Sequence, residues 1–337
     1  MTQLQQAKST VLAYFSAMES ATSQSVAGIL QRHLSADIDW YGSYPFNQLK
    51  GPGAVATGFW EPLLRAFSSL QRRQDIFMAG VNEVSGDVWT MSMGHFMGLF
   101  DSEWLGIRPH GKTAMLRYAE FNCVDPASGK IVKTGMFCDI IALMQQVGLN
   151  PLPAQTGASF LCPGPRTHDG ILLQPQAEEE GTKTLELLNR MIDDLNQLNL
   201  SGENNCPPDY LERTWSRDMV WYGPAGIGAA YTIPRYQQQH QYPFREGLGD
   251  KVYNGHVCRF AEGNYACFFG WPNLSHTPTG GFMGLPGGQR TDMRVVDVYR
   301  RDGDKLLENW VLIDILYWLK LQGLDVLERM RSIENPS

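Results

Sequence analysis

The feature that most constrains the fold is an internal repeat, in which residues of the first half recur in the second half at nearly constant spacing. The matched strings are Asp37–Gly42 with Asp218–Gly223, 181 positions apart, Lys112–Met115 with Arg290–Met293, 178 apart, and Asp139 with Asp314, 175 apart. The spacing falls in two steps of three residues, as two short loop deletions in the second copy would produce. We therefore expect a tandem duplication of one domain.

The chain length agrees with two copies. A chain of 337 residues is comfortable for two domains of about 150 residues. We expect a first domain over residues 1–150, a proline-rich strap over 151–180 and a second domain over 181–337. The strap also carries apolar residues, so we expect it to pack against one of the domains rather than to act as a free tether.

Each copy starts with helical patterns and continues with strand patterns. In the first copy, helical spacing covers residues 4–19, 23–34 and 52–67. Runs that favour strands follow, separated by Gly, Asp and Pro turns. In the first copy they cover residues 74–81, 87–96, 113–124 and 130–138. This order predicts an α+β fold, with helices packed on one face of an antiparallel sheet.

Charge and cysteine usage exclude several classes of function. The net charge of −7 disfavours binding to nucleic acid or to an anionic membrane, and no run of about 18 apolar residues predicts a transmembrane helix. The first residues do not resemble a signal peptide, and six scattered cysteines without a C-x-x-C pair indicate reduced thiols in the cytoplasm. No nucleotide, metal or other cofactor motif occurs.

A set of short motifs in the same order in both copies resembles a known family. In the first copy the motifs are Gly94-His95, Leu105–Pro109, Gly129–Ile131 and Asp139–Gly148. In the second copy they are His276, Met283–Pro286, Asp302-Gly303 and Glu308–Asp314. Together they resemble the SnoaL-like polyketide cyclases of the NTF2-like superfamily.

The resemblance implies a fold and a chemistry. Each domain would be a cone of helices on a strongly curved antiparallel sheet, with an apolar pocket open at one end. Cyclases of this kind use an aspartate, assisted by a histidine, to close a polyketide ring by aldol condensation without a cofactor. The superfamily also includes isomerases, epoxide hydrolases and proteins without catalysis, so the fold alone does not settle the function.

Asp139 and Asp314 are the first candidate catalytic residues, and each has two interpretations. Each ends an apolar run and precedes a helical pattern, so it could simply cap that helix, a contribution of ~1 kcal/mol. Alternatively, its apolar flanks would raise its pKa and make it a general base for a proton next to a carbonyl group. Both interpretations stay open.

His95 and His276 are the candidate partners of these aspartates. Each could polarise a carbonyl group or assist proton transfer, although a lone histidine is more often a structural hydrogen-bonding residue. Aromatic residues could line a pocket for a flat substrate, and about half of them are equally well explained by core packing. The candidates for substrate binding are Trp40, Tyr41, Trp60, Trp104, Trp221, Tyr222 and Trp310.

The leading functional hypothesis is cofactor-independent acid–base chemistry, of cyclase or isomerase type, on a small apolar or aromatic carbonyl compound. The alternatives are a binding module for an apolar ligand and an ester or epoxide hydrolase. The first copy has Gly135 where the second has Trp310, so one copy could be active and the other a partner domain. We expect the copies to form an internal pseudo-dimer, and a further homodimer is left open.

Overall fold

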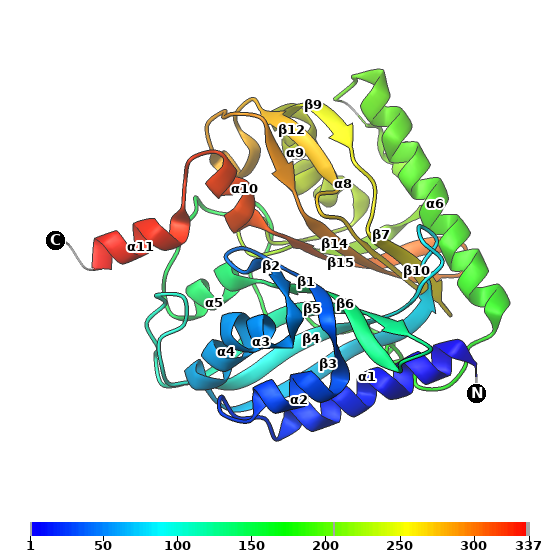
Figure 1. The fold of residues 1–337 in the computed structure, drawn as a ribbon. Coiled ribbons are helices and arrows are strands. Elements are labelled where there is room, and N and C mark those ends of the chain that lie inside the picture. The colour runs from blue at the N-terminus through cyan, green and yellow to red at the C-terminus, as the bar shows by residue number, and fades with distance from the viewer. Residues whose placement is uncertain (1, 205, 335–337) are drawn as a thin grey trace. The chain divides into compact units, whose positions relative to one another are not determined.

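The computed structural model describes residues 2–204 and 206–334, and the chain divides into two compact units. Unit 1 comprises Met1–Pro151, Arg166–Pro175 and Asp325–Ser337, and unit 2 comprises Leu152–Pro165 and Gln176–Leu324. The segment between the two copies is therefore divided between the units. Figure 1 shows the course of the chain, with the elements labelled.

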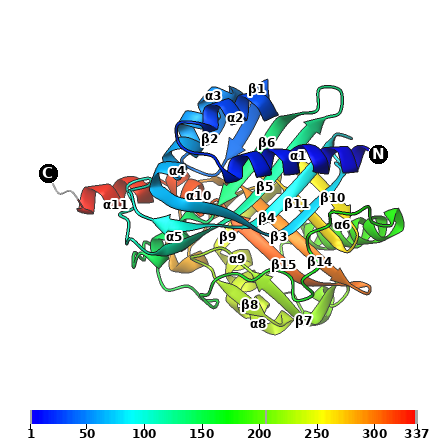
Figure 2. The ribbon, with the colours of Figure 1, turned by 90° about the horizontal axis from the view of Figure 1, so that it is seen from below.

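Unit 1 begins with helices and continues with the strands of one sheet. Its elements are α1 (Gln3–Glu19), α2 (Val26–His33), β1 (Leu34–Gly42), β2 (Asn47–Lys50), α3 (Gly51–Val55), the π-helix η1 (Ala56–Trp60), α4 (Glu61–Ala66), β3 (Phe67–Val81), β4 (Val88–Phe100), β5 (Thr113–Asp125), β6 (Lys130–Cys138), α5 (Ile140–Gln146) and α11 (Val326–Glu334). The helix predicted over 52–67 is thus a run of α3, η1 and α4. Helix α1 crosses the strands of this sheet (Figure 2).

Unit 2 repeats the order of elements with shorter strands. Its elements are α6 (Glu178–Ser201), α7 (Pro208–Leu211), β7 (Trp215–Tyr222), β8 (Ala229–Tyr231), α8 (Ile233–Tyr236), the π-helix η2 (Gln237–Gln241), α9 (Tyr242–Gly247), β9 (Leu248–Tyr253), β10 (Cys258–Glu262), β11 (Tyr265–Phe269), β12 (Leu274–Pro278), the 3-10 helix η3 (Phe282–Gly284), β13 (Thr291–Met293), β14 (Val295–Asp302), β15 (Lys305–Ile313) and α10 (Ile315–Leu321).

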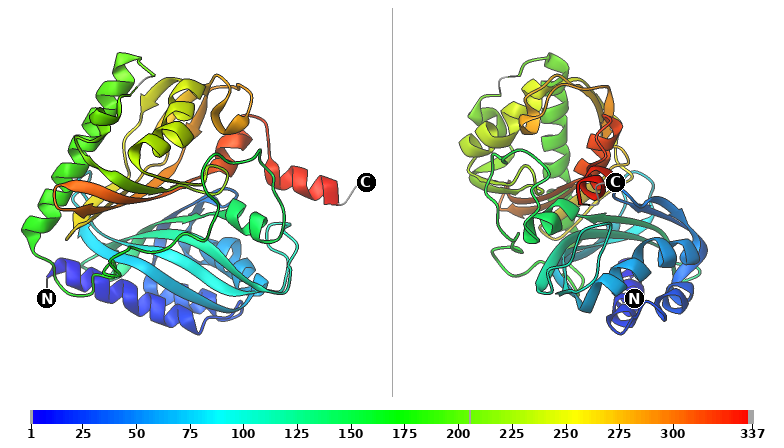
Figure 3. Two further views of the ribbon diagram at one scale, coloured as in Figure 1. Left: turned by 180° about the vertical axis from the view of Figure 1, so that it is seen from behind. Right: turned by 90° about the vertical axis from the view of Figure 1, so that its left-hand side faces the viewer.

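The two main sheets have the same topology. Unit 1 has the strand order β2-β1-β6-β5-β4-β3, and unit 2 has the matching order β8-β7-β15-β14-β11-β10. In each sheet one pair of strands is parallel, β1 with β6 in unit 1 and β7 with β15 in unit 2. A parallel pair needs a long connection between its two strands, and the helices and strands between them in the chain provide it. The other pairs are antiparallel, and both sheets are curved (Figure 3). The shared order confirms the predicted duplication of an α+β domain.

The long strands of unit 1 are interrupted in unit 2. Strand β4 runs unbroken over 13 residues, whereas its counterpart stops at Phe269 and resumes as β12 at Leu274. Pro272 in this gap has no backbone N–H to donate to a sheet, which favours a break there. Strands β9, β12 and β13 therefore form a separate three-stranded sheet, and residues 270–273 form a loop beside β14.

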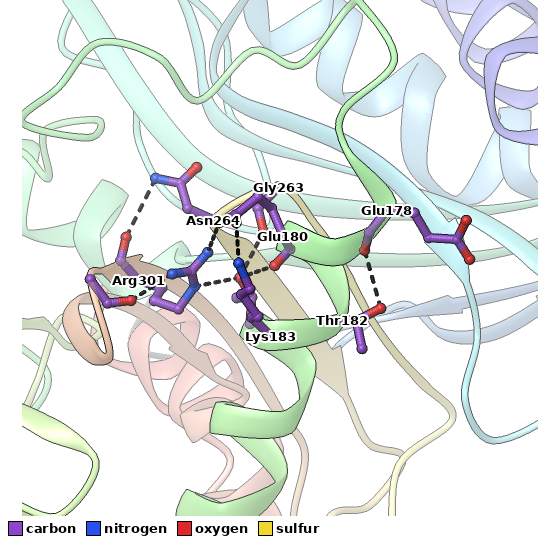
Figure 4. Close-up of polar contacts among 9 residues, drawn as sticks. Glu178, Glu180, Thr182, Lys183, Gly263, Asn264 and Arg301 are labelled. Atoms are coloured by element: carbon purple, nitrogen blue, oxygen red, sulfur yellow. Dashed lines mark hydrogen bonds and ion pairs between the residues drawn. The ribbon is translucent and has the colours of Figure 1, made fainter.

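Helix α6 is fixed at its N-terminal end to the sheet of unit 2. The guanidinium group of Arg301, on β14, donates to Glu180 and, at 2.8 Å, to the hydroxyl of Thr184 (Figure 4). That hydroxyl also donates to the carbonyl oxygen of Gly263, at 2.7 Å, in the turn between β10 and β11. These bonds hold α6 along the sheet, so that its apolar side faces the interior of unit 2.

The repeated Trp-Tyr-Gly string has a packing cause in both units. A Cβ atom on Gly42 would lie 2.1 Å from the ring of Trp40, and one on Gly223 would lie 2.1 Å from the ring of Trp221. Only glycine lets the indole fold over the chain two residues later. The string therefore marks a structural feature that both copies need.

Candidate functional site in the second unit

Unit 2 contains a cavity of about 230 Å³ between the inner face of its main sheet and the helices α6, η2 and α9. Most of its wall is apolar, with large contributions from Met191, Trp215, Trp221, Phe244, Phe268 and Val311. The polar groups that reach the wall include Asp297, Tyr299, Asn309, Asn273, His240 and His256. An apolar cavity with a few polar groups is the usual form of a small-molecule site.

Strand β14 places a carboxyl group in this cavity through simple alternation. Side chains of a strand point alternately to opposite faces, so Val295, Asp297 and Tyr299 share the inner face. All three line the cavity, whereas Val296 and Val298 are buried on the other side of the strand. The β-branched residues favour the strand, and the acid among them then faces inward.

Asp297 is held by hydrogen bonds and lies in an environment that favours its neutral form. Asn309 donates to Oδ1 of Asp297 at 3.2 Å, and the hydroxyl of Tyr299 donates to the same carboxylate. Burial raises the pKa of Asp297 to about 7, against the smaller opposite effect of these two bonds. Although it lies deep in the unit, part of Asp297 stays accessible because it borders the cavity.

Two histidines of the wall are neutral at physiological pH. His240, on η2, stacks on the indole of Trp221 with ring centroids 4.1 Å apart, and burial lowers its pKa to about 3. His256 stacks on Phe268 at 3.9 Å, and burial, followed by the charge of Arg259, lowers its pKa to about 3. A neutral imidazole offers one donor and one acceptor, and both rings can therefore hydrogen-bond an uncharged ligand.

The position of Asp297 has a counterpart in unit 1. Asp297 pairs with Val311, three residues before Asp314, and Glu120 pairs with Met136, three residues before Asp139. The two acids therefore occupy the same place on β14 and β5.

Their surroundings differ. Glu120 lies 2.7 Å from the guanidinium group of Arg72, and both side chains are buried. The strand pairs that start four residues before each acid, at Leu116 and Met293, lead to Arg72 in unit 1 and to Tyr253 in unit 2. Among the described residues, no cationic side chain forms an ion pair with Asp297.

Arg72 fills the interior of unit 1 that corresponds to the cavity. Its guanidinium group lies 3.8 Å from the ring centroid of Phe15 and 4.8 Å from that of Tyr118. Glu120 also accepts a hydrogen bond from Asn122 at 3.1 Å, and Asn122 accepts one from Thr134 at 2.8 Å. The interior of unit 1 at this place thus holds a buried ion pair and its neighbours, whereas Asp297 in unit 2 borders a cavity.

The predicted catalytic aspartates both cap helices. Asp139 accepts a hydrogen bond from the backbone N–H of Ala142 at the start of α5, at 3.0 Å. Asp314 accepts one from Tyr317 at the start of α10, at 3.3 Å, and lies 3.4 Å from the guanidinium group of Arg294. Neither lines the cavity of unit 2. Their catalytic role stays a prediction.

The predicted histidine partners lie elsewhere. His95, on β4, lies 3.5 Å from the carboxylate of Asp75. His276, on β12, accepts a hydrogen bond at 2.8 Å from the indole of Trp318, and burial, as the largest cause, lowers its pKa to about 4. Neither is brought to a predicted aspartate by a contact described in the structure.

The predicted aromatic residues divide between the cavity and the cores. Trp221 lines the cavity, and its counterpart Trp40 packs in the core of unit 1 against Phe59. Trp60 and Trp104 are also buried in unit 1, and Tyr41 is half-buried on β1. Tyr222 and Trp310 stack on each other, with ring centroids 5.6 Å apart and an angle of 22° between the rings. The indole of Trp310 donates to the carbonyl oxygen of Pro163 at 2.9 Å, which fixes part of the strap to unit 2.

Five residues of the cavity wall were not predicted from the sequence: Asp297, Asn309, Asn273, His240 and His256. One signal was available, because Val295-Val296-Asp297-Val298-Tyr299 places an acid and a tyrosine on the same face of a β-branched run. The second signal was the repeat itself. At its spacing of 181 residues, His240 of the second copy matches Phe59 of the first, so a polar residue stands where the first copy has an apolar one.

Over residues 2–204 and 206–334, no three His, Cys, Asp or Glu side chains are grouped as metal ligands would be. Over the same residues, no helix combines the length and the apolar character that crossing a bilayer would require.

Comparison with known proteins finds similarity only among solved structures. No protein-family model and no curated protein matches the chain. A candidate hydroxylase from Streptomyces galilaeus aligns with 42% of this chain and 95% of its own, at 20% identity and a TM-score of 0.34. A candidate SnoaL-like polyketide cyclase from Jannaschia aligns with 45% of this chain and 98% of its own, at 16% identity and a TM-score of 0.34. A candidate polyketide cyclase from Xanthomonas campestris aligns with 43% and 99%, at 18% identity and a TM-score of 0.34.

Proposed function

We propose that unit 2 is a cofactor-independent acid–base enzyme acting on a small apolar carbonyl compound, with Asp297 as its general base. One observation carries the proposal. Glu120 and Asp297 occupy the same place in two copies of one fold, and only Asp297 borders an open apolar cavity without an ion-pair partner among the described residues. A structural acid would be expected to keep its counter-ion, as Glu120 does.

The chemistry follows from the pKa. A carboxyl group with a pKa of about 7 is ionised in about half of the molecules at neutral pH, so it can both take and return a proton. In the forward step, Asp297 takes a proton from the carbon next to the carbonyl group. The electron pair of the broken C–H bond forms the C=C bond of an enolate, and the negative charge moves to the oxygen. Asp297 then returns its proton to carbon or to oxygen.

The residues around Asp297 support this role. Asn309 and Tyr299 hold the carboxylate in one orientation, which keeps it ready to accept a proton. Neutral His240 can hydrogen-bond a ligand without adding a charge, and Trp221 supplies a flat apolar surface beside it. The apolar wall excludes water, and this favours an uncharged ketone over its hydrated form.

Proton exchange tests the proposal without knowledge of the natural substrate. The probe is 2-tetralone, an apolar fused-ring ketone, in deuterated water, with deuterium uptake at its α-carbon measured by mass spectrometry. The wild-type chain should accelerate uptake, and the rate should rise with pH up to about 7 and then level off, because Asp297 must be ionised. His240 and His256 titrate at about 3 and should add no step in this range.

Asp297→Asn should reduce the catalysed exchange by at least about a hundredfold. Asp292→Asn is the matched control, because Asp292 lies on β13, accepts a hydrogen bond from Ser275 and does not line the cavity. Exchange that survives in Asp297→Asn would overturn the role of Asp297. Tight binding of the ketone by the wild type with no exchange would instead indicate a binding module.

A further inference from the structure

Asn273 is held in place by nearly all of its hydrogen-bonding groups. Its backbone N–H donates to the carbonyl oxygen of Met293 at 3.0 Å, and its own carbonyl oxygen accepts from Asn254 at 2.8 Å. Its side-chain oxygen accepts from the backbone N–H of Val295 at 2.7 Å. Because a backbone N–H can only donate, this last bond fixes which end of the amide is oxygen and which is nitrogen.

The side-chain nitrogen of Asn273 is the group of this residue that forms no hydrogen bond within the described part of the chain. It is buried and has no acceptor among the described residues, and the residue lines the cavity with only 6% of its surface exposed. A buried donor without an acceptor is unfavourable, so native proteins seldom leave one unsatisfied. A ligand with an oxygen atom at this end of the cavity would satisfy it.

The loop is shaped to accommodate this amide. A Cβ atom on Gly270 would lie 2.3 Å from Cγ of Asn273 and 2.7 Å from its side-chain nitrogen. Any other residue at position 270 would therefore displace the amide. The backbone N–H of Gly270 donates to the carbonyl oxygen of Val295 at 3.1 Å, which fixes the loop to β14. Val295 thus holds both the loop and the side chain of Asn273.

The same strand carries the proposed base. Val295 and Asp297 are two residues apart on β14 and share its inner face, a separation of about 7 Å along the strand. A bound ketone could reach both residues across a distance of this order. Its carbonyl oxygen would accept a hydrogen bond from the side-chain nitrogen of Asn273, and the C–H bond of its α-carbon would point at the carboxylate of Asp297. Donor and base are thus two parts of one site.

We propose that Asn273 is a catalytic residue, the hydrogen-bond donor that binds the carbonyl oxygen of the substrate and stabilises the enolate charge. This inference rests on the proposed function. When Asp297 takes the α-proton, the charge develops on the oxygen that Asn273 already contacts. The donor does not have to reorient during the reaction, which is the condition for strong stabilisation of such a charge.

The site also specifies the class of substrate. Arg245 is the cationic side chain among the described lining residues, and its N–H groups already donate to Asn199 and to the carbonyl oxygens of Leu198, Glu203 and Asn204. Carboxylates and phosphates would therefore find no available cation beside the Asp297 carboxylate. The substrate class is an uncharged ketone or aldehyde with an acidic α-hydrogen.

The test uses carbonyl-labelled 2-tetralone and two measurements, the deuterium exchange rate and the infrared stretching frequency of the bound C=O group. Hydrogen bonding lowers this frequency, so the wild-type complex should absorb below the free ketone in an apolar solvent. Asn273→Ala removes the donor, together with the acceptor of the N–H of Val295. It should slow exchange about a hundredfold and shift the C=O band back to the apolar value.

Two further variants separate this role from a structural one. Gly270→Ala keeps Asn273 but displaces its amide, so it should also shift the band and slow exchange. Asn254→Ala makes the same truncation in a neighbour that does not line the cavity, and both readouts should stay at wild-type values. Circular dichroism and melting curves check that each variant is folded.

The outcomes distinguish this inference from the proposed function. If Asp297→Asn abolishes exchange while Asn273→Ala changes neither readout, Asp297 is the base and Asn273 does not bind the carbonyl oxygen. If the wild type shows no exchange but its C=O band depends on Asn273, the carbonyl contact stands and the proposed catalysis fails. Failure of the wild type to bind the ketone would overturn both.

Discussion

Glu120 and Asp297 occupy the same position on corresponding strands, yet Glu120 lies 2.7 Å from the guanidinium group of Arg72 and Asp297 borders an open cavity. Burial in the cavity pushes the carboxyl group of Asp297 towards its neutral form. The two copies therefore differ in the surroundings of this acid, which is ion-paired in unit 1 and borders a cavity in unit 2.

Asp297→Asn should stabilise unit 2 at pH 8 and leave its stability unchanged at pH 4. The folded-state pKa of about 7 lies above the ordinary value of 3.8, so the folded state keeps this proton through the range between the two values. Stability from this group is fully present below pH 4 and is lost as the pH rises to about 7. The two pKa values differ by an amount worth roughly 4 kcal/mol, and we expect a gain of about 2–4 kcal/mol at pH 8.

Calorimetry of wild type and variant at both pH values measures this difference. Asp292→Asn serves as the control, because Asp292 does not line the cavity. An Asp297→Asn variant that is less stable than the wild type at pH 8 would mean that the carboxylate is favoured in the folded state, contrary to the raised pKa.

Glu120→Gln should destabilise unit 1 by about 3–5 kcal/mol, because it leaves the buried guanidinium group of Arg72 without its counter-ion. Chemical denaturation, with the transitions of the two units analysed separately, measures the effect. Deuterium exchange on 2-tetralone by the folded variant should be unchanged. A large loss of exchange would instead indicate that a residue of unit 1 takes part in the reaction.

His240→Phe reproduces the residue that unit 1 carries at this place, Phe59. The stack on Trp221 should persist, as the contact of Phe59 with Trp40 shows, so the melting temperature should change little. Phenylalanine cannot form the hydrogen bond that the imidazole of His240 would make to the bound ketone. The exchange rate should therefore fall about tenfold, while the affinity for the ketone stays unchanged. Equal rates for variant and wild type would remove His240 from the site.

Asp139→Ala should cost about 1 kcal/mol of stability and Asp139→Asn much less, because asparagine also caps helices. Asp314→Ala should also lower stability, since it removes both the cap of α10 and the partner of Arg294. Denaturation curves of the three variants measure these losses. Loss of exchange in Asp139→Asn at unchanged stability would instead support the catalytic role predicted from the sequence.

The duplication and the α+β class were predictable because they depend on local patterns that both copies keep. The helix spacing, the strand alternation and the Trp-Tyr-Gly string all reflect interactions between near neighbours in the chain. The parallel pairs β1–β6 and β7–β15 were not predicted, since such a pair joins residues about 90 positions apart.

The site was harder to predict for a related reason. Residues identical in the two copies mark what both folds require, such as the caps Asp139 and Asp314. A cavity present in one copy consists of residues in which the copies differ, such as Asp297 against Glu120 and His240 against Phe59. Only the strand register shows that these residues correspond, and register depends on contacts distant in the sequence.

Helix α11 follows unit 2 in the chain but belongs to unit 1, where Tyr44 donates to the carboxylate of Asp325 at 2.6 Å and Arg331 packs against Gly106. A ribosome therefore completes all of unit 2 before unit 1 receives this helix. The first half of the protein must wait, with the surface around Tyr44 and Gly106 uncovered, until the second half has been translated. Folding of unit 1 is thereby linked to the synthesis of unit 2.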